Sequence, residues 1–208
     1  SYVLLLEVTY LFMRKNKVIG LFLIIISIAW PLYTHKQETN KLVISAKAVD
    51  LYIRRTTLSY EKESNTKELD NPKYDYIAIL EIPDISLKQG LVSKDSPYND
   101  IKYNIAIIGG DLPNIPKSNL ILASHNGSSN VSFFKNLESI GDKSIIYLYY
   151  NGYKYIYKLA NSYIVSKTGE INISRDKTRN TLTLITCKNN SDTEQIVFIS
   201  YLIDKKKY

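Results

Sequence analysis

From Tyr76 onward the chain is a succession of short segments rich in Ile, Val, Leu, Tyr and Thr, separated by polar or glycine-containing turns. Such segments are typical of β-strands. The strongest hairpin signal is Asn151-Gly152, because both residues tolerate the positive φ of a type I′ turn. About eight strands in roughly 130 residues predict a mainly β chain that closes, or nearly closes, into a barrel. The expected strands are Tyr76–Ile82, Ser86–Val92, Asn104–Ile108, Ser118–Ala123, Lys143–Tyr150, Tyr153–Val165, Thr181–Thr186 and Gln195–Ile203, interrupted by one short helical segment, Val131–Ile140.

A different kind of segment lies near the start of the chain. Residues 18–34 contain no charged side chain and are close to the minimum length for crossing a bilayer. Arg14, Lys15 and Lys17 precede them, and the positive-inside rule places such a flank in the cytoplasm. The alternatives are a cleaved signal peptide and a buried core helix. Because no clear small-residue cleavage site follows, we interpret residues 13–34 as a basic flank and an uncleaved transmembrane helix.

This anchor divides the chain into regions. Met13 is the only methionine, so we interpret residues 1–12 as an upstream extension of the gene model. Residues 35–73 are polar and are expected to form a linker, helical in part because apolar residues within 41–58 approach a 3.6-residue period. Residues 74–208 are expected to form the β-barrel.

The composition limits the chemistry that is open to the chain. One cysteine and two histidines rule out an intramolecular disulfide framework and a cysteine-cluster zinc site. The sequence contains no phosphate-binding glycine motif and no His-Glu-x-x-His motif, and neither a metal nor a cofactor is expected. The formal net charge is +7, but the basic residues are mixed with acids along the chain, so we do not expect a nucleic-acid partner.

Two chemically capable residues stand where predicted strands end. Cys187 comes directly before a polar loop, and His125 comes directly before a glycine-containing one. A side chain at a strand end is held by the sheet and yet faces the loops. If the two strands are neighbours, the imidazole can help the thiol to ionise and can later protonate a leaving amine. The alternatives are a buried, unreactive cysteine and a structural histidine.

The residues around these positions resemble the motifs of the sortase family. Thr181-Leu-Thr-Leu-Ile-Thr-Cys187 resembles the sortase cysteine motif, and Leu122-Ala-Ser-His125-Asn-Gly127 resembles the histidine motif. Ile79-Leu-Glu-Ile-Pro83 looks like the family's first strand, and residues 134–142 are similar to the helix and turn after the histidine. The resemblance extends over roughly residues 76–203 and implies an eight-stranded sortase barrel outside a Gram-positive cell membrane.

What the resemblance implies is a cysteine transpeptidase, a hydrolase-like thiol enzyme of the cell wall. In sortases the cysteine attacks a backbone carbonyl in the C-terminal sorting signal of a surface protein and forms a thioester. An amine of the wall precursor lipid II, or a pilin lysine, then resolves it. Cys187 is the implied nucleophile and His125 the implied acid and base. No second membrane span is expected, and the segment 166–180 is short, which favours a class A-like or related housekeeping type.

The sequence departs from the family at one position. Sortases carry an arginine at the start of the strand after the cysteine loop, and this chain has Gln195 there. We expect Gln195 to act as a neutral hydrogen-bond donor to substrate or oxyanion, without the charge and five donors of arginine. The alternatives are that Arg175 or Arg179 reaches in from the preceding loop, or that the enzyme is impaired.

Two other functions remain open. A membrane-anchored cysteine peptidase would use Cys187 and His125 in the same way but release the acyl group to water. A non-catalytic barrel would bind peptides or wall polymers, with an unreactive Cys187 and basic residues that meet anionic partners.

Overall fold

The computed structural model describes residues 26–34, 46, 48–54 and 75–208. The chain divides into two compact units, Ser1–Val43 and Ile44–Tyr208. In the first unit, residues 26–34 are helical. The expected extension at 1–12 and most of the expected anchor at 13–34 lie outside the described residues. Within the described ranges, no helix is long and apolar enough to cross a bilayer.

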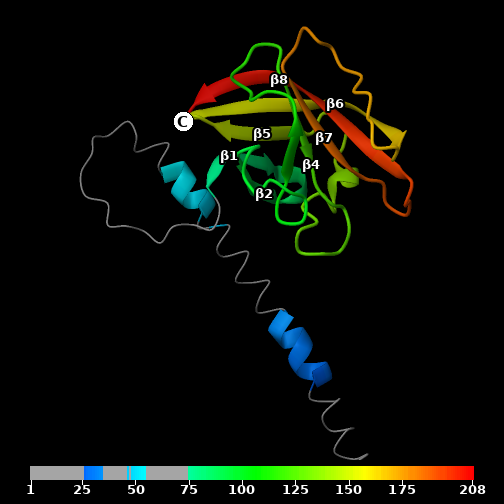
Figure 1. Cartoon of the computed structure of the whole chain (residues 1–208). Helices are drawn as coiled ribbons and strands as arrows, with labels where there is room; N and C mark the ends of the chain where they lie inside the picture. The colour runs from blue at the N-terminus through cyan, green and yellow to red at the C-terminus, as the bar shows by residue number, and fades with distance from the viewer. Residues whose placement is uncertain (1–25, 35–45, 47, 55–74) are drawn as a thin grey trace, which may run out of the picture. The chain divides into compact units, whose positions relative to one another are not determined.

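The second unit contains a single eight-stranded sheet that curls into a nearly closed barrel (Figure 1). The strands are β1 (Tyr76–Ile82), β2 (Leu87–Val92), β3 (Ala106–Gly109), β4 (Asn119–Ala123), β5 (Ile145–Tyr150), β6 (Tyr153–Ser166), β7 (Thr181–Cys187) and β8 (Glu194–Lys207). Their order is β2-β1-β5-β6-β8-β7-β4-β3. β4 and β7 are parallel, and the other neighbours are antiparallel. The prediction of a mainly β, eight-stranded barrel is confirmed.

The turn and burial patterns explain why these segments form strands. Asn151 and Gly152 both adopt positive φ, 48° and 73°, and so close the hairpin between β5 and β6. Alternate residues of β5 are buried, as expected for a strand with one face in the core. β7 is buried on both faces over its first six residues, since apolar clusters cover it on either side. The interior is filled by branched and aromatic side chains that include Leu80, Tyr157, Leu184 and Phe198.

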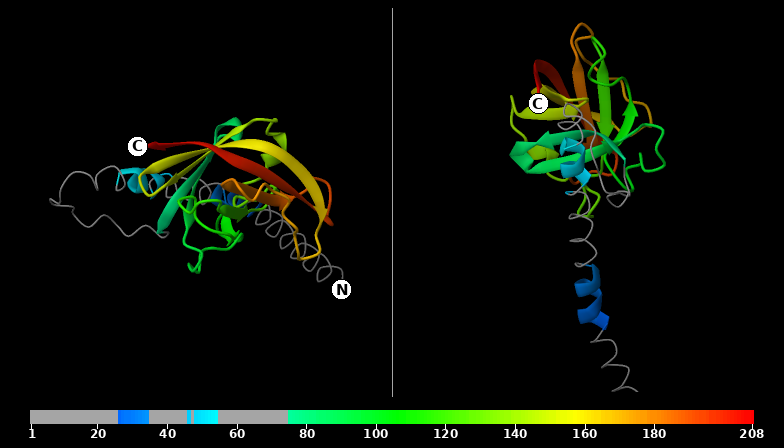
Figure 2. Two further views of the ribbon diagram at one scale, coloured as in Figure 1. Left: turned by 90° about the horizontal axis from the view of Figure 1, so that it is seen from above. Right: turned by 90° about the vertical axis from the view of Figure 1, so that its left-hand side faces the viewer.

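β6 and β8 are the longest strands, and they run side by side as a curved pair (Figure 2). β8 continues to Lys207, whereas the sequence pattern predicted its end at Ile203. The charged tail stays in the sheet because Lys207 pairs with Tyr153 at the start of β6. Lys205 adds a cation–π contact, with its ammonium 3.9 Å from the centre of the Tyr153 ring.

The helix predicted at Val131–Ile140 is wrong in type and length. This region contains turns and one 3₁₀ segment, η2 (Leu137–Ser139); a second, η1 (Pro83–Ile85), follows β1. The amide of Leu137 bonds to the carbonyl of Phe134 at 3.0 Å, three residues away. The amide of Phe134 instead donates to the carbonyl of His125, also at 3.0 Å, so a continuous α-helical ladder cannot begin there.

A short helix packs on the outside of β1 and β2. Residues 46 and 48–54 are helical, which agrees with the helical period of the 41–58 segment. Ala48 and Val49 are buried in a small cluster with Ile79 and Val92. The hydroxyl of Tyr52 donates to the carbonyl of Ile77 at 2.7 Å. The compact unit accordingly begins at Ile44, and this helix belongs to it.

Candidate active site

The parallel pairing of β4 and β7 brings the two predicted functional residues to one edge of the sheet (Figure 1). The alignment continues beyond the end of β4. The amide of Ser124 donates to the carbonyl of Ile185 at 3.3 Å, and the Thr186 hydroxyl donates to the carbonyl of Ser124 at 2.9 Å. His125, the next residue, is therefore level with Cys187 at the end of β7. Both side chains are half-buried.

His125 is also held from its other side. The side-chain amide of Asn126 donates to the main-chain carbonyl of Cys187, and it donates to Oδ1 of Asn189 at 3.1 Å. The carbonyl of His125 accepts from the amide of Phe134. The residues before and after His125, Ser124 and Asn126, are both hydrogen-bonded to β7. These bonds fix the position of the His125 backbone relative to that of Cys187.

Two further side chains lie beside the thiol. Gln195 is the register partner of Cys187 across β7 and β8, so the two side chains are on the same face of the sheet. Lys167 follows β6, and its Nζ is 3.8 Å from the Cys187 Sγ. Its backbone amide donates to the carbonyl of Thr193 at 2.7 Å, which fixes Lys167 beside the start of β8.

Sequence reasoning did not single out Lys167. Its nearness to Cys187 arises because β6 pairs with β8 and β8 pairs with β7, with Val165 opposite Gln195 and Gln195 opposite Cys187. A lysine in a polar loop carries no local signal of this kind. To place Lys167 beside Cys187 from the sequence, the order of β6, β8 and β7 in the sheet would have to be known.

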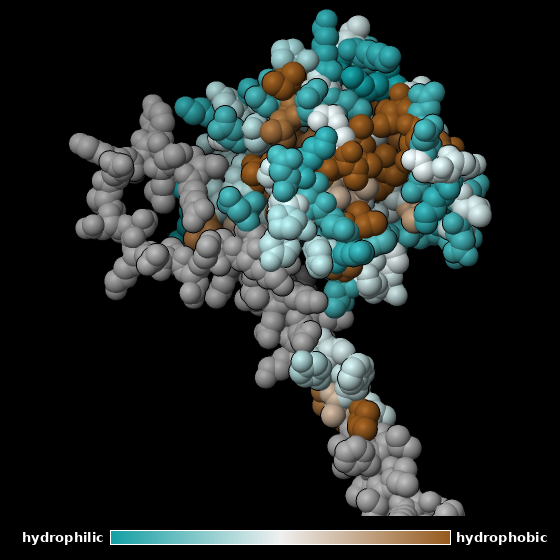
Figure 3. Space-filling model, in the orientation of Figure 1, coloured by the Kyte–Doolittle hydropathy of each residue, from teal (hydrophilic) through white to brown (hydrophobic). Residues whose placement is uncertain are grey.

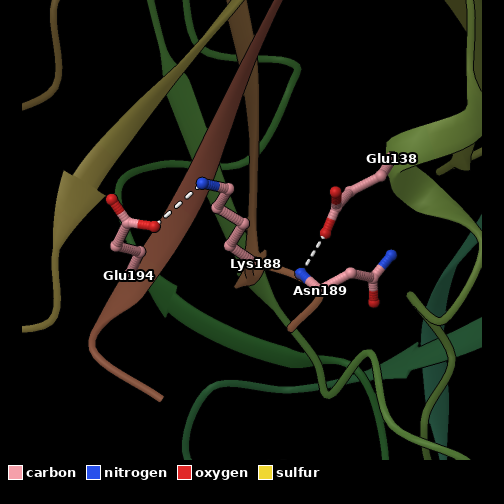
Figure 4. A network of polar contacts seen from close by, with 4 residues as sticks. All are labelled: Glu138, Lys188, Asn189 and Glu194. Atoms are coloured by element: carbon pink, nitrogen blue, oxygen red, sulfur yellow. Dashed lines mark hydrogen bonds and ion pairs between the residues drawn. The ribbon is translucent and has the colours of Figure 1, made fainter. Parts of the chain in front are cut away.

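The loop that follows Cys187 is tied down by polar contacts (Figure 4). Lys188 Nζ lies 2.9 Å from Glu194 Oε2, and the Lys188 amide donates to the Glu194 carbonyl at 3.0 Å. The amide of Asn189 donates to the Glu138 carboxylate of η2. The Lys188 ammonium, through its hydrogen bond and charge, holds the pKa of the Glu194 carboxyl below its ordinary value. Lys188 is thus paired with Glu194.

Arg175 and Arg179 lie at the other end of β7. Arg175 donates to the Thr181 hydroxyl and to the Lys117 carbonyl, both at 3.3 Å. The Arg179 guanidinium stacks 4.2 Å from the centre of the Tyr201 ring. Thr181 begins β7 and Cys187 ends it, a separation of about 20 Å along an extended strand. In this structure, neither Arg175 nor Arg179 is placed to take over the role of the missing arginine beside Cys187.

A buried apolar cluster borders the site. Ile185, Val197 and Ile199 lie on the outer face of β7 and β8, and Ile171 and Ile173 from the β6–β7 loop are among the half-buried side chains that cover them. Figure 3 shows apolar side chains, in brown, gathered on the face that carries β4 and β7. Among the described residues, no group of three or more His, Cys, Asp or Glu side chains is placed to hold a metal ion.

Comparison with known proteins gives the family. A family model described as the sortase domain matches residues 80–202. No curated protein matches the chain. Sortase C-3 of Streptococcus pneumoniae is 16% identical with a TM-score of 0.57, over 81% of this chain and 86% of that one. The sortase D5 transpeptidase of Clostridium perfringens is also 16% identical, with a TM-score of 0.56 over 78% of this chain and 99% of that one.

Sortase A of Listeria monocytogenes is 19% identical with a TM-score of 0.54, over 64% of this chain and 90% of that one. At these identities the solved structures establish the fold, and they include sortases of several classes. The family model covers more than half of the chain and contains both His125 and Cys187. The chain belongs to the sortase family.

Proposed function

We propose that this protein is a sortase transpeptidase, held in the cell membrane by a transmembrane helix within residues 13–34, with its barrel on the extracellular side. It cleaves the C-terminal sorting signals of surface proteins and transfers them to an amine of the cell-wall precursor, such as lipid II. The observation that carries the proposal is the alignment of His125 with Cys187 at the ends of two parallel strands. The same alignment would serve a hydrolytic peptidase.

In the first half of the reaction, the Cys187 sulfur attacks the carbonyl carbon of the scissile peptide bond. Negative charge develops on the carbonyl oxygen, and the Gln195 amide, on the same face as Cys187, is the neutral donor for it. The C–N bond then breaks as protonated His125 gives its proton to the leaving amine. The products are a thioester on Cys187 and the released C-terminal fragment.

In the second half, an amine replaces the fragment that left. Neutral His125 accepts a proton from this amine as the amine nitrogen attacks the thioester carbon. The C–S bond breaks and Cys187 leaves as a thiolate. One amide bond has been broken and one formed, so the reaction needs no external energy source.

Half-buried apolar side chains beside Cys187 suit a peptide substrate. An extended peptide presents side chains alternately, and those facing the barrel can bury apolar groups against Val165 and Ile171, which cover the buried Ile185 and Val197. The segment 166–180 borders this face and is the proposed recognition loop. Its shortness favours a class A-like or related housekeeping role.

An intact-mass experiment tests the proposal. The full chain is incubated with a pool of sorting-signal peptides, and a mass increase equal to an acyl fragment is sought. The adduct should be absent in Cys187→Ala and His125→Ala and should be discharged by glycine amines faster than by water. Equal discharge by water would replace the transpeptidase with the peptidase. If neither the natural chain nor Gln195→Arg forms an adduct, the non-catalytic binding barrel is favoured.

A further inference from the structure

The neutral Gln195 leaves open which group supplies positive charge at Cys187. Charged or titratable side chains stand on several segments next to Cys187. They are His125 after β4, Lys167 after β6, Lys188 and Asp192 on the β7–β8 loop, and Glu194 at the start of β8. Glu138 on η2 accepts the Asn189 amide. Each has to be considered before the charge is assigned.

Lys188 and Glu194 neutralise each other at 2.9 Å. The Glu138 carboxylate is bonded to the backbone of Asn189. Lys167 differs, because its ammonium is 3.8 Å from the Cys187 sulfur and forms no ion pair with a carboxylate of the described residues. A cation at this distance from sulfur favours the thiolate over the thiol.

We propose that Lys167 supplies the positive charge that stabilises negative charge on the Cys187 sulfur, in place of the arginine that sortases carry at the position of Gln195. The charge would thus come from the end of β6 rather than from the start of β8. The hydrogen bond from the Lys167 amide to the Thr193 carbonyl supports this role, because it fixes the backbone from which the side chain reaches the sulfur. The role depends on Cys187 being the nucleophile of the proposed function.

Lys167 and His125 would divide two tasks. Lys167 would supply the charge beside the sulfur and take no part in the proton transfers of the reaction. The imidazole can therefore be neutral when it accepts a proton from the incoming amine, while the cation beside the sulfur persists. Without Lys167, His125 would have to provide both the proton acceptor and the positive charge beside the sulfur.

Alkylation of Cys187 tests this without any peptide substrate. Cys187 is the only cysteine, so iodoacetamide uptake by the full chain reports on this thiol alone. The reagent is uncharged, so its approach is not steered by lysines. The rate is measured from pH 5 to pH 9 for the natural chain, Lys167→Met, Lys167→Arg and the exposed control Lys102→Met.

We expect Lys167→Met to alkylate about fivefold more slowly at pH 7 and to need a higher pH for the same rate, because the thiolate loses its cation. Lys167→Arg and Lys102→Met should follow the natural chain. A Lys167→Met variant with the natural rate and pH profile would overturn the proposal. So would a Lys167→Arg variant as slow as Lys167→Met, since charge would then not be what matters.

A second measurement separates this inference from the function itself. If peptides acylate Cys187, Lys167→Met should lower kcat more than it raises KM, and Gln195→Arg in the same chain should restore part of the loss. A KM effect without a kcat effect would assign Lys167 to substrate binding and contradict the proposal. If no peptide acylates Cys187 but alkylation depends on the charge at 167, the proposed function fails, and only the effect of the Lys167 charge on the thiol is established.

Discussion

The side-chain amide of Asn126 donates a hydrogen bond to the main-chain carbonyl of Cys187, which joins the residue after His125 directly to the thiol-bearing residue. The bond crosses from the loop after β4 to the end of β7. With the Thr186–Ser124 bond on the other side, it brackets His125. The spacing of imidazole and thiol therefore depends on a side chain that performs no chemistry.

Asn126→Ala is expected to lower kcat about tenfold with little change in KM, because a small misplacement of reacting groups is costly in rate. The measurement is steady-state transfer of a sorting-signal peptide to a glycine amine. Asn189→Ala is the matched control. It removes only the 3.1 Å bond to Asn189 Oδ1 and keeps the bond to Cys187, so it should stay near the natural rate. Equal losses in both variants would show that loop order, and not the Asn126–Cys187 bond, is what counts.

Gln195→Ala is expected to lower kcat by roughly 10², because one hydrogen-bond donor to the developing oxyanion is lost. Gln195→Arg should retain or exceed the natural rate, since arginine offers more donors and a charge. Acylation rates of Cys187, followed by rapid quench and intact mass, give both values. An alanine variant that acylates at the natural rate would remove Gln195 from the reaction.

The strands were predictable because their signals are local. Tyr76–Ile82 was predicted with both of its observed bounds, since an apolar run begins after a polar segment and ends at Pro83. The end of β8 was not predictable in the same way. Lys205-Lys206-Lys207 looks like a solvated tail, and what keeps it in the sheet is pairing with β6, which is distant in sequence.

The positions of the two candidate residues at strand ends were predictable from local signals. His125 lies just beyond β4 and Cys187 is the last residue of β7, and the parallel pairing of these strands aligns the two residues. Which of Lys167, Arg175 and Arg179 lies near Cys187 was not predictable, because all three belong to the same segment, 166–180. Only the fold shows that its first residues lie at Cys187 and its last at Thr181.

Val49→Ala is expected to destabilise the compact unit by about 1 kcal/mol, because Val49 is only 6% exposed and packs against Ile79 and Val92. Thermal unfolding of the full chain measures this effect. Arg54→Ala, on the same helix, is the control. It breaks the exposed 3.0 Å ion pair with Asp50 and should change the stability little. If Val49→Ala were as stable as the natural chain, the helix would not contribute to the barrel.

Glu194→Gln is expected to reduce the unfolding temperature by at most a few degrees at pH 7, and the reduction should vanish in acid. Lys188 lowers the folded-state pKa of Glu194 below its ordinary value of 4.5. The stabilisation is therefore complete above pH 4.5 and is lost as the pH falls through the lowered pKa. Thermal unfolding of the two chains between pH 7 and pH 2 should show the gap closing below pH 4.5.

Lys188→Met supplies the matched comparison for this pair. It should cause a similar reduction at pH 7, and the double variant should lose less than the sum of the two single changes, because both remove the same contact. Added salt should shrink the gap, since the pair is partly exposed to solvent. A gap that stayed constant or widened as the pH fell would mean that Glu194 is stabilised by something other than its charge.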